Sequence, residues 1–196
     1  MASKRLYILT GEVSGDLHAA NLLRELKQHH PDVQVRGIGG DRLAGDGMSL
    51  LRHIDTTSFM GFVEVAMNIR RINKMFAETK QDIADFQPDA ILFVDYPGFN
   101  LRMAKWAHVN DYQTIWYISP KVWAWGQGRI PKLKERIDHM MTILPFEQQF
   151  YREHGMEVAY VGNPLLDALE QESPENPDYD TLYETLGLNP TQPVTA

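Results

Sequence analysis

With 196 residues, the chain has the length of one domain and can bury a sizeable hydrophobic core. Hydrophobic residues make up 43% of the sequence and charged residues 23%, which is typical of a globular protein and excludes a disordered chain. A formal net charge of −7 argues against a nucleic-acid partner, because nucleic-acid binding usually needs a basic face. The sequence has no cysteine, which excludes a disulfide scaffold and a thiolate metal site.

Short apolar runs alternate along the chain with longer stretches of helical periodicity, the pattern of β-α-β units around a parallel sheet. Most of these runs are continuous, as expected for strands that are covered on both faces. We expect strands at residues 5–10, 33–38, 90–95, 114–119, 140–144 and 158–161, with a weaker one at 49–53. We expect helices at residues 17–28, 59–86 (broken once), 101–109, 130–137 and 146–154. The predicted fold class is therefore α/β, a doubly wound parallel sheet.

Two features bear on the compartment. The first apolar run, residues 6–9, is too short for the core of a signal peptide and is predicted to be a strand. No run of about 18 apolar residues occurs, so we expect no membrane-spanning helix. The sequence therefore predicts a cytoplasmic protein and leaves peripheral membrane contact open.

The character of the chain changes after Leu169. Residues 170–178 are acidic, contain two prolines and lack apolar side chains, which predicts an exposed linker. A short helix is expected at 179–186, and residues 193–196 resemble the start of a strand. We therefore expect one domain over residues 1–169, and a linker followed by the beginning of a second domain over 170–196.

Ligands bind to open parallel sheets beyond the carboxyl ends of the strands, and the polar, glycine-rich loops of this chain gather there. In the loop at residues 11–18, two glycines permit a tight turn, and the N–H groups of the following helix can bind an anion or a sugar oxygen. Alternatively, Ser14 or Asp16 simply caps that helix. The glycines at residues 37–42 favour a plain turn into a helix.

Two further loops carry candidate chemistry. Asp95 ends a strongly apolar strand, where a carboxylate is costly unless it is paired or used. It either serves a reaction or accepts N–H groups from the turn that follows. Lys121, Trp123, Trp125 and Arg129 form either a sugar- or phosphate-facing wall or an aromatic loop that covers the core. The histidines show no metal-ligand spacing, and we expect neither a metal nor a cofactor.

Six motifs occur in an order that resembles the lipid-A-disaccharide synthase family. They lie at residues 11–16 (GEVSGD), 60–65 (MGFVEV), 94–100 (VDYPGFN), 117–120 (YISP), 122–125 (VWAW) and 144–147 (LPFE). The resemblance extends from about residue 4 to residue 169. Two departures stand out: residues 162–164 read Gly-Asn-Pro where many members have Gly-His-Pro, and the second domain of the family is absent.

The resemblance implies a GT-B fold, in which two Rossmann-like domains face each other across the active site. It implies transfer from UDP-2,3-diacylglucosamine to 2,3-diacylglucosamine 1-phosphate through a β-1,6 bond, with inversion and release of UDP. It also implies a place at the cytoplasmic face of the inner membrane of Gram-negative bacteria. This chain would be the acceptor-side half and inactive alone. The rivals are another GT-B relative, such as a sugar-nucleotide epimerase, and a non-catalytic domain that binds lipid or sugar.

Residue roles follow from the resemblance. Asp95 is expected to be the general base, with Glu12 as its main competitor. The residues expected to bind the acceptor are Glu12, Ser14, Gly15, Asp16, Tyr96, Asn100 and Arg129, the last of which would meet a phosphate.

The segment 58–80 combines apolar and basic residues, as an interfacial helix on anionic lipid does. The residues expected at the membrane are Phe59, Met60, Phe62, Arg70, Arg71 and Lys74. An ordinary core helix would explain the same apolar positions.

Overall fold

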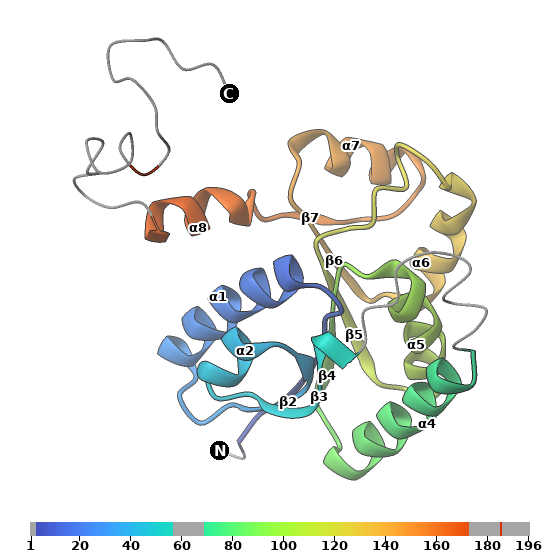
Figure 1. Cartoon of the computed structure of the whole chain (residues 1–196). Coiled ribbons are helices and arrows are strands. Elements are labelled where there is room, and N and C mark those ends of the chain that lie inside the picture. Colours follow the sequence, from blue (N-terminus) through green and yellow to red (C-terminus); the bar gives the residue numbers. More distant parts are fainter. Residues whose placement is uncertain (1–2, 57–68, 173–184, 186–196) are drawn as a thin grey trace. The chain divides into compact units, whose positions relative to one another are not determined.

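The computed structural model describes residues 3–56, 69–172 and 185 of the chain (Figure 1). Within these residues one parallel sheet has the strand order β3-β2-β1-β4-β5-β6-β7. The strands are β1 (Arg5–Leu9), β2 (Gln34–Gly39), β3 (Ser49–His53), β4 (Ala90–Val94), β5 (Gln113–Tyr117), β6 (His139–Thr142) and β7 (Ala159–Tyr160). Every predicted strand forms, the weaker one at 49–53 included, and the α/β fold class is confirmed.

The central strands are largely apolar because both of their faces are covered. In β1, Tyr7 and Leu9 enter one buried cluster while Ile8 enters the other. In β5, Trp116 and Tyr117 divide in the same way. Successive side chains of a strand point to opposite faces, so two covered faces require a continuous apolar run.

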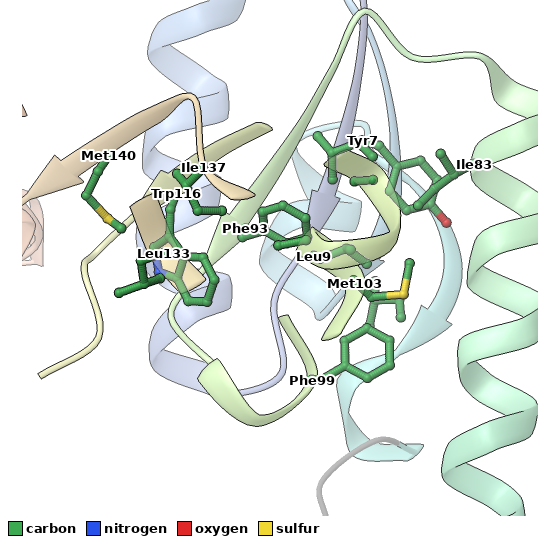
Figure 2. Packing of buried hydrophobic residues seen from close by; sticks show 14 of the residues in the cluster. Tyr7, Leu9, Ile83, Phe93, Phe99, Met103, Trp116, Leu133, Ile137 and Met140 are labelled. Carbon is green, nitrogen blue, oxygen red and sulfur yellow. The ribbon is translucent and has the colours of Figure 1, made fainter. Parts of the chain in front are cut away.

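Helices cover the two faces unequally (Figure 1). The helices are α1 (Val13–His29), α2 (Asp41–Gly45), α4 (Ile69–Phe86), α5 (Pro97–Val109), α6 (Ile130–Arg136), α7 (Pro145–Glu153) and α8 (Pro164–Glu172), with 3-10 turns at Ile54–Thr56 and Gln127–Arg129. Side chains of α4, α5, α6 and α7 pack in the cluster with Tyr7, and those of α1 and α2 pack in the cluster with Ile8. Figure 2 shows the first cluster, to which α5 contributes Phe99 and Met103 and α4 contributes Ile83.

Two helices begin a full turn earlier than predicted. α1 begins at Val13 and α5 at Pro97, four residues ahead of the predicted starts in each case. Proline at the first position of α5 has the φ angle of a helix and lacks the N–H that would go unpaired there. The turn into a helix expected at residues 37–42 is observed, and it leads into the five-residue helix α2. The helix α8 was absent from the prediction.

An ion pair connects α4 to the sheet. The carboxylate of Asp82 on α4 accepts hydrogen bonds from Nε and Nη2 of Arg36 at 2.8 and 2.7 Å, and from the hydroxyl of Tyr7 at 2.7 Å. Burial pushes the pKa of Asp82 upward, but the hydrogen bonds from Arg36 and Tyr7 outweigh it and lower the pKa below the ordinary value. Of the helix predicted over residues 59–86, the part from Ile69 to Phe86 is observed, and residues 57–68 lie outside the described part.

Contacts divide the chain into two compact units, Met1–Pro164 and Leu165–Ala196. The sheet and the helices from α1 to α7 belong to the first unit. None of the described helices is both long enough and apolar enough to cross a bilayer.

Candidate functional site

The candidate site lies where the strand order reverses. β1 pairs with β2 on one side and with β4 on the other. In open parallel sheets, ligands bind in the crevice outside the carboxyl ends of the strands at such a switch point. The β1–α1 loop, with Glu12, and the β4–α5 turn, with Asp95 and Tyr96, both leave the sheet here.

A pocket of about 230 Å³ lies next to this switch point, over the carboxyl ends of β4, β5 and β6. Its lining residues come from segments 95–97, 118–129 and 143–147. Ligand sites typically enclose about 300–1,000 Å³, so this pocket suits a small group, such as one sugar ring, better than a large ligand.

Asp95 lines the pocket, and the pKa of its carboxyl is raised. Burial raises the pKa of the Asp95 carboxyl and the charge of Glu12 raises it further, whereas the Tyr96 N–H and the charge of Lys121 act in the opposite direction. A carboxylate with a raised pKa accepts a proton more readily, as a general base must. Asp95 thus accepts an N–H group of the turn, as one alternative from the sequence has it, and also lines the pocket, while its part in a reaction stays a prediction.

The backbone beside the pocket is strained at three residues. Asp95, Tyr96 and Ile118 have φ angles of 42°, 49° and 63°, and residues other than glycine pay roughly 1–3 kcal/mol for each such conformation. The left-handed region is especially unusual for a β-branched residue such as Ile118. The Asp95 N–H donates to the Tyr117 carbonyl at 3.1 Å and so connects the two strained turns. Strain of this kind clusters at functional sites, which supports a site here.

Asn100 holds the Asp95 turn from inside. Its side chain is fully buried, and Nδ2 donates to the carbonyl oxygens of Asp95, Leu9 and Val94 at 2.7, 3.3 and 3.4 Å. Asn100 therefore supports the turn from behind, and the acceptor contact expected of it from the sequence stays a prediction.

The loop after β1 approaches Asp95 through Glu12, whose side chain is exposed. After burial, the charge of Glu12 is the second cause that raises the pKa of Tyr96, as it is for Asp95. The Tyr96 ring packs directly on Gly11, where an added Cβ would lie 2.4 Å from ring carbon Cγ. The structure therefore brings Glu12, Tyr96 and Asp95 together, and their contact with an acceptor stays a prediction.

The other predicted residues of this loop have different surroundings. Ser14 is exposed, whereas Gly15 is buried with an added Cβ only 2.2 Å from Thr10 Oγ1. Asp16 is 3% exposed and accepts the backbone N–H groups of Gly40, Arg42 and Leu43 at 2.6, 3.1 and 3.4 Å. Asp16 is thus a cap, but of α2 rather than of its own helix, and it can shape the acceptor pocket only by fixing these two loops.

The segment between β5 and α6 contributes positive charge and an aromatic ring. Lys121 and Arg129 line the pocket and are exposed, and Trp125 lines it with 67% of its surface exposed. Trp123 instead packs edge-on against Phe146, with ring centroids 5.0 Å apart. The two tryptophans therefore separate the alternatives: Trp123 packs on a neighbouring ring, while Trp125 lines the pocket.

Sequence reasoning missed one polar pair at the pocket. Ser119 donates to Oε1 of Glu147 at 2.6 Å, and both residues are buried and line the pocket. The available signal was a glutamate three positions into a helix, which often turns back to the helix start. Nothing in the sequence places Ser119, 28 positions earlier, beside it.

The predicted membrane residues are only partly described. Phe59, Met60 and Phe62 lie outside the described residues. Arg70 is exposed, Arg71 donates to the Thr56 carbonyl at 2.9 Å, and Lys74 lies 3.7 Å from Glu78. Further along α4, Met75 and Phe76 pack in the core, and the membrane contact stays a prediction. Among the described residues, no group of three His, Cys, Asp or Glu side chains is placed to hold a metal ion.

Sequence comparison relates this chain to known proteins. The family profile described as lipid-A-disaccharide synthetase matches residues 6–194. The chain is 40% identical over 192 residues to the lipid-A-disaccharide synthase of Chromohalobacter salexigens, which covers 98% of this chain and 49% of that protein. The identity to the Coxiella burnetii protein of the same name is 34% over 196 residues, with 100% and 51% covered. The chain spans about half the length of these relatives.

Solved structures with the same fold are more distant. UDP-N-acetylglucosamine 2-epimerase from Rickettsia bellii superimposes with a TM-score of 0.65 at 13% identity, covering 96% of this chain and 52% of that chain. The corresponding Neisseria meningitidis enzyme, bound to UDP-GlcNAc, gives 0.56 at 12%, with 94% and 51% covered. At these identities the likeness shows the fold alone, and it confirms the Rossmann-like, GT-B type of sheet.

Proposed function

This chain belongs to the lipid-A-disaccharide synthetase family, and we propose that it is the acceptor-side half of an inverting glycosyltransferase of lipid A synthesis. The chain spans about half of its relatives, so we assign the nucleotide-sugar site to the other half. The reaction would join UDP-2,3-diacylglucosamine to 2,3-diacylglucosamine 1-phosphate through a β-1,6 bond.

The observation that carries this proposal is the position of Asp95. Its carboxyl lines a pocket at the end of β4, and burial together with Glu12 raises its pKa. In the proposed step the acceptor's 6-hydroxyl oxygen bonds to the anomeric carbon of the donor. The bond from that carbon to UDP breaks, UDP leaves with the electron pair, and Asp95 takes the hydroxyl proton. One base and no covalent intermediate suffice for inversion.

The remaining groups fit an acceptor that carries a phosphate and a sugar ring. Arg129 and Lys121 would attract the phosphate, because both are exposed cations at the pocket. Trp125 lines the pocket with a largely exposed side chain, on which a sugar can stack. Glu12 would bind a sugar hydroxyl at the edge next to Asp95.

A transfer assay tests the proposal. Radiolabelled UDP-diacylglucosamine and acceptor are incubated with the 196-residue chain and with the same chain extended by the C-terminal half of the Chromohalobacter salexigens relative. Disaccharide is expected only from the extended protein. Disaccharide from the short chain would contradict the assignment of the donor site to the other half. Conversion of the UDP-sugar without acceptor would favour an epimerase. Binding of the acceptor without turnover in the extended protein would favour a non-catalytic domain.

We further propose that the protein works at the cytoplasmic face of the inner membrane, as a diacylated acceptor requires, with Phe59, Met60 and Phe62 as apolar contacts. Arg70, Arg71 and Lys74 supply a basic flank for anionic lipid.

Sedimentation with anionic phospholipid vesicles tests the membrane proposal. Binding should weaken when Arg70, Arg71 and Lys74 are all changed to glutamate. A matched control is Lys132→Glu together with Lys134→Glu on α6, which should leave binding nearly unchanged. Equal binding by both variants, or no binding by the wild type, would contradict the proposal.

A further inference from the structure

Glu147 is a buried carboxylate that only accepts hydrogen bonds. The residue is 1% exposed. Its Oε2 accepts the backbone N–H groups of Ile143 and Leu144 at 3.2 and 2.9 Å, and its Oε1 accepts the Ser119 hydroxyl at 2.6 Å. These donors anchor the carboxylate at the start of α7.

The short bond to Glu147 determines the polarity of Ser119, that is, whether its hydroxyl donates or accepts a hydrogen bond towards the pocket. A hydroxyl has one proton and two lone pairs, and a 2.6 Å bond to a carboxylate is a strong, charge-assisted one. The proton of Ser119 is therefore committed to Glu147, and towards other partners its oxygen acts as an acceptor.

Tyr151, the other hydroxyl beside this pair, does not change that polarity. Burial and the charge of Glu147 raise the pKa of Tyr151 to about 12, although a hydrogen bond with Ser119 acts in the opposite direction. Tyr151 therefore remains protonated. Its own proton points to the Pro120 carbonyl at 3.4 Å. Even if Tyr151 turned to Ser119, it would occupy one lone pair and leave the second.

The pocket therefore has acceptors and donors on different segments. Asp95 and Ser119 supply acceptor oxygens from the ends of β4 and β5, while Lys121 and Arg129 supply donors. A sugar has several donors of its own, and Asp95 is assigned to the reacting hydroxyl. A second acceptor at a fixed position is suited to a donor that does not react.

We propose that Ser119 determines specificity by accepting a hydrogen bond from a non-reacting donor of the acceptor sugar, and that Glu147 fixes the polarity of this contact. The inference rests on the acceptor-side function proposed above. Two donors qualify on that substrate, the 4-hydroxyl and the N–H of the 2-amide. Sites built to accept a bond from one ligand group discriminate against analogues that lack it.

Glu147→Gln inverts the polarity with little change in shape. The amide oxygen must face the N–H groups of Ile143 and Leu144, which leaves the amide NH₂ to donate to Ser119. The Ser119 proton is then free to point into the pocket. Glu153→Gln is the matched control, because it makes the same change on the same helix at an exposed position whose partner is Gln149.

Calorimetric binding to the 196-residue chain tests the proposal with a short-chain 2,3-diacylglucosamine 1-phosphate. Its 4-deoxy, 4-fluoro and 2-ester analogues are the probes, because fluorine and an ester oxygen can accept but not donate. For the wild type, either both 4-substituted analogues or the ester should bind roughly 10-fold more weakly than the parent, the size of one hydrogen bond.

The variants then identify the residue responsible. Ser119→Ala should abolish that preference, and Glu147→Gln should shift it towards the fluoro or ester analogue, while Glu153→Gln keeps the wild-type pattern. Thermal unfolding of each variant checks that it is folded.

Three results would overturn the inference and leave the acceptor-side function intact: no wild-type preference, an unchanged preference in Ser119→Ala, or identical patterns in the two glutamine variants. Failure of the wild-type chain to bind the parent acceptor would instead overturn the proposed function and, with it, the inference.

Discussion

Nδ2 of Asn100 lies 2.7 Å from the carbonyl oxygen of Asp95, so a buried amide holds the strained turn that carries the proposed base. Asn100→Ala removes this bond and those to Leu9 and Val94. Buried acceptors left unpaired cost about 1–3 kcal/mol, so the free energy of unfolding should fall by that amount in urea titrations. Asn110→Ala is the control, since Asn110 ends the same helix with one exposed bond to Trp106. Equal losses in both variants would contradict the role of Asn100.

Asp95→Asn should lower turnover of the extended two-domain protein by roughly 100-fold or more, the usual contribution of a general base, with acceptor binding largely kept. Glu12→Gln should mainly weaken acceptor binding. The measurement is steady-state kinetics with both substrates. Near-normal turnover in Asp95→Asn together with its loss in Glu12→Gln would assign the base to Glu12.

The pH profile gives an independent check on the base. Since burial and Glu12 raise the pKa of Asp95, kcat/KM should increase with pH and reach its half-maximum above the ordinary aspartate value. Glu12→Gln removes one raising charge and should move the midpoint down. Lys121→Ala removes a lowering charge and should move it up. A midpoint that both changes leave in place would argue against Asp95.

Asp95→Asn should also stabilise the fold at neutral pH. A carboxyl whose pKa is raised by folding binds its proton more tightly in the native state, so native stability falls as pH rises from the unfolded pKa through the folded one. Asparagine is neutral and tolerates positive φ better than most residues. The stability gain in thermal unfolding should therefore be present at pH 7 and shrink below the ordinary aspartate pKa.

Asp82→Asn should destabilise the protein by about 1–3 kcal/mol, because it weakens the paired bonds from Arg36 and the bond from Tyr7. Folding lowers the pKa of Asp82. In the wild type, the stability that this carboxylate contributes is therefore fully present above the unfolded aspartate pKa, and it is lost as the pH falls through the folded pKa. Asp82→Asn removes this contribution. Asp85→Asn, on the same helix and bonded only to exposed Gln81 among the described residues, is the control. Urea titrations at pH 7 and at pH 3 compare them.

Gly11→Ala should impair turnover of the extended protein, since the new Cβ would lie 2.4 Å from the Tyr96 ring and would displace the turn that holds Asp95. Gly45→Ala adds the same methyl group where no atom lies within 4 Å, and its activity should stay normal. Kinetics of the two variants measure the difference. A fully active Gly11→Ala would show that the packing of Tyr96 on Gly11 is dispensable.

Much of the fold was readable from the sequence, because its determinants are local. Continuous apolar runs such as residues 90–94 predict strands covered on both faces, and the alternation with helical segments predicts parallel pairing. The carboxyl ends of parallel strands share one edge, so the polar loops at Glu12 and Asp95 could be assigned to one site before any coordinates. Helix starts were less accurate, since the first turns of α1 and α5 lack an apolar repeat.

Tertiary structure alone decided which polar groups meet. Asp16 caps α2 instead of α1, Asn100 bonds the turn beside Asp95, and Ser119 pairs with Glu147. In each case the order of the strands and the placement of the loops bring the two partners together. The apolar periodicity of the sequence carries no information about which residues become partners. The sequence by itself therefore determined the sheet and the edge at which we expect a ligand to bind. The polarity of the pocket wall depends on hydrogen bonds between distant segments, which only the packed fold brings into reach.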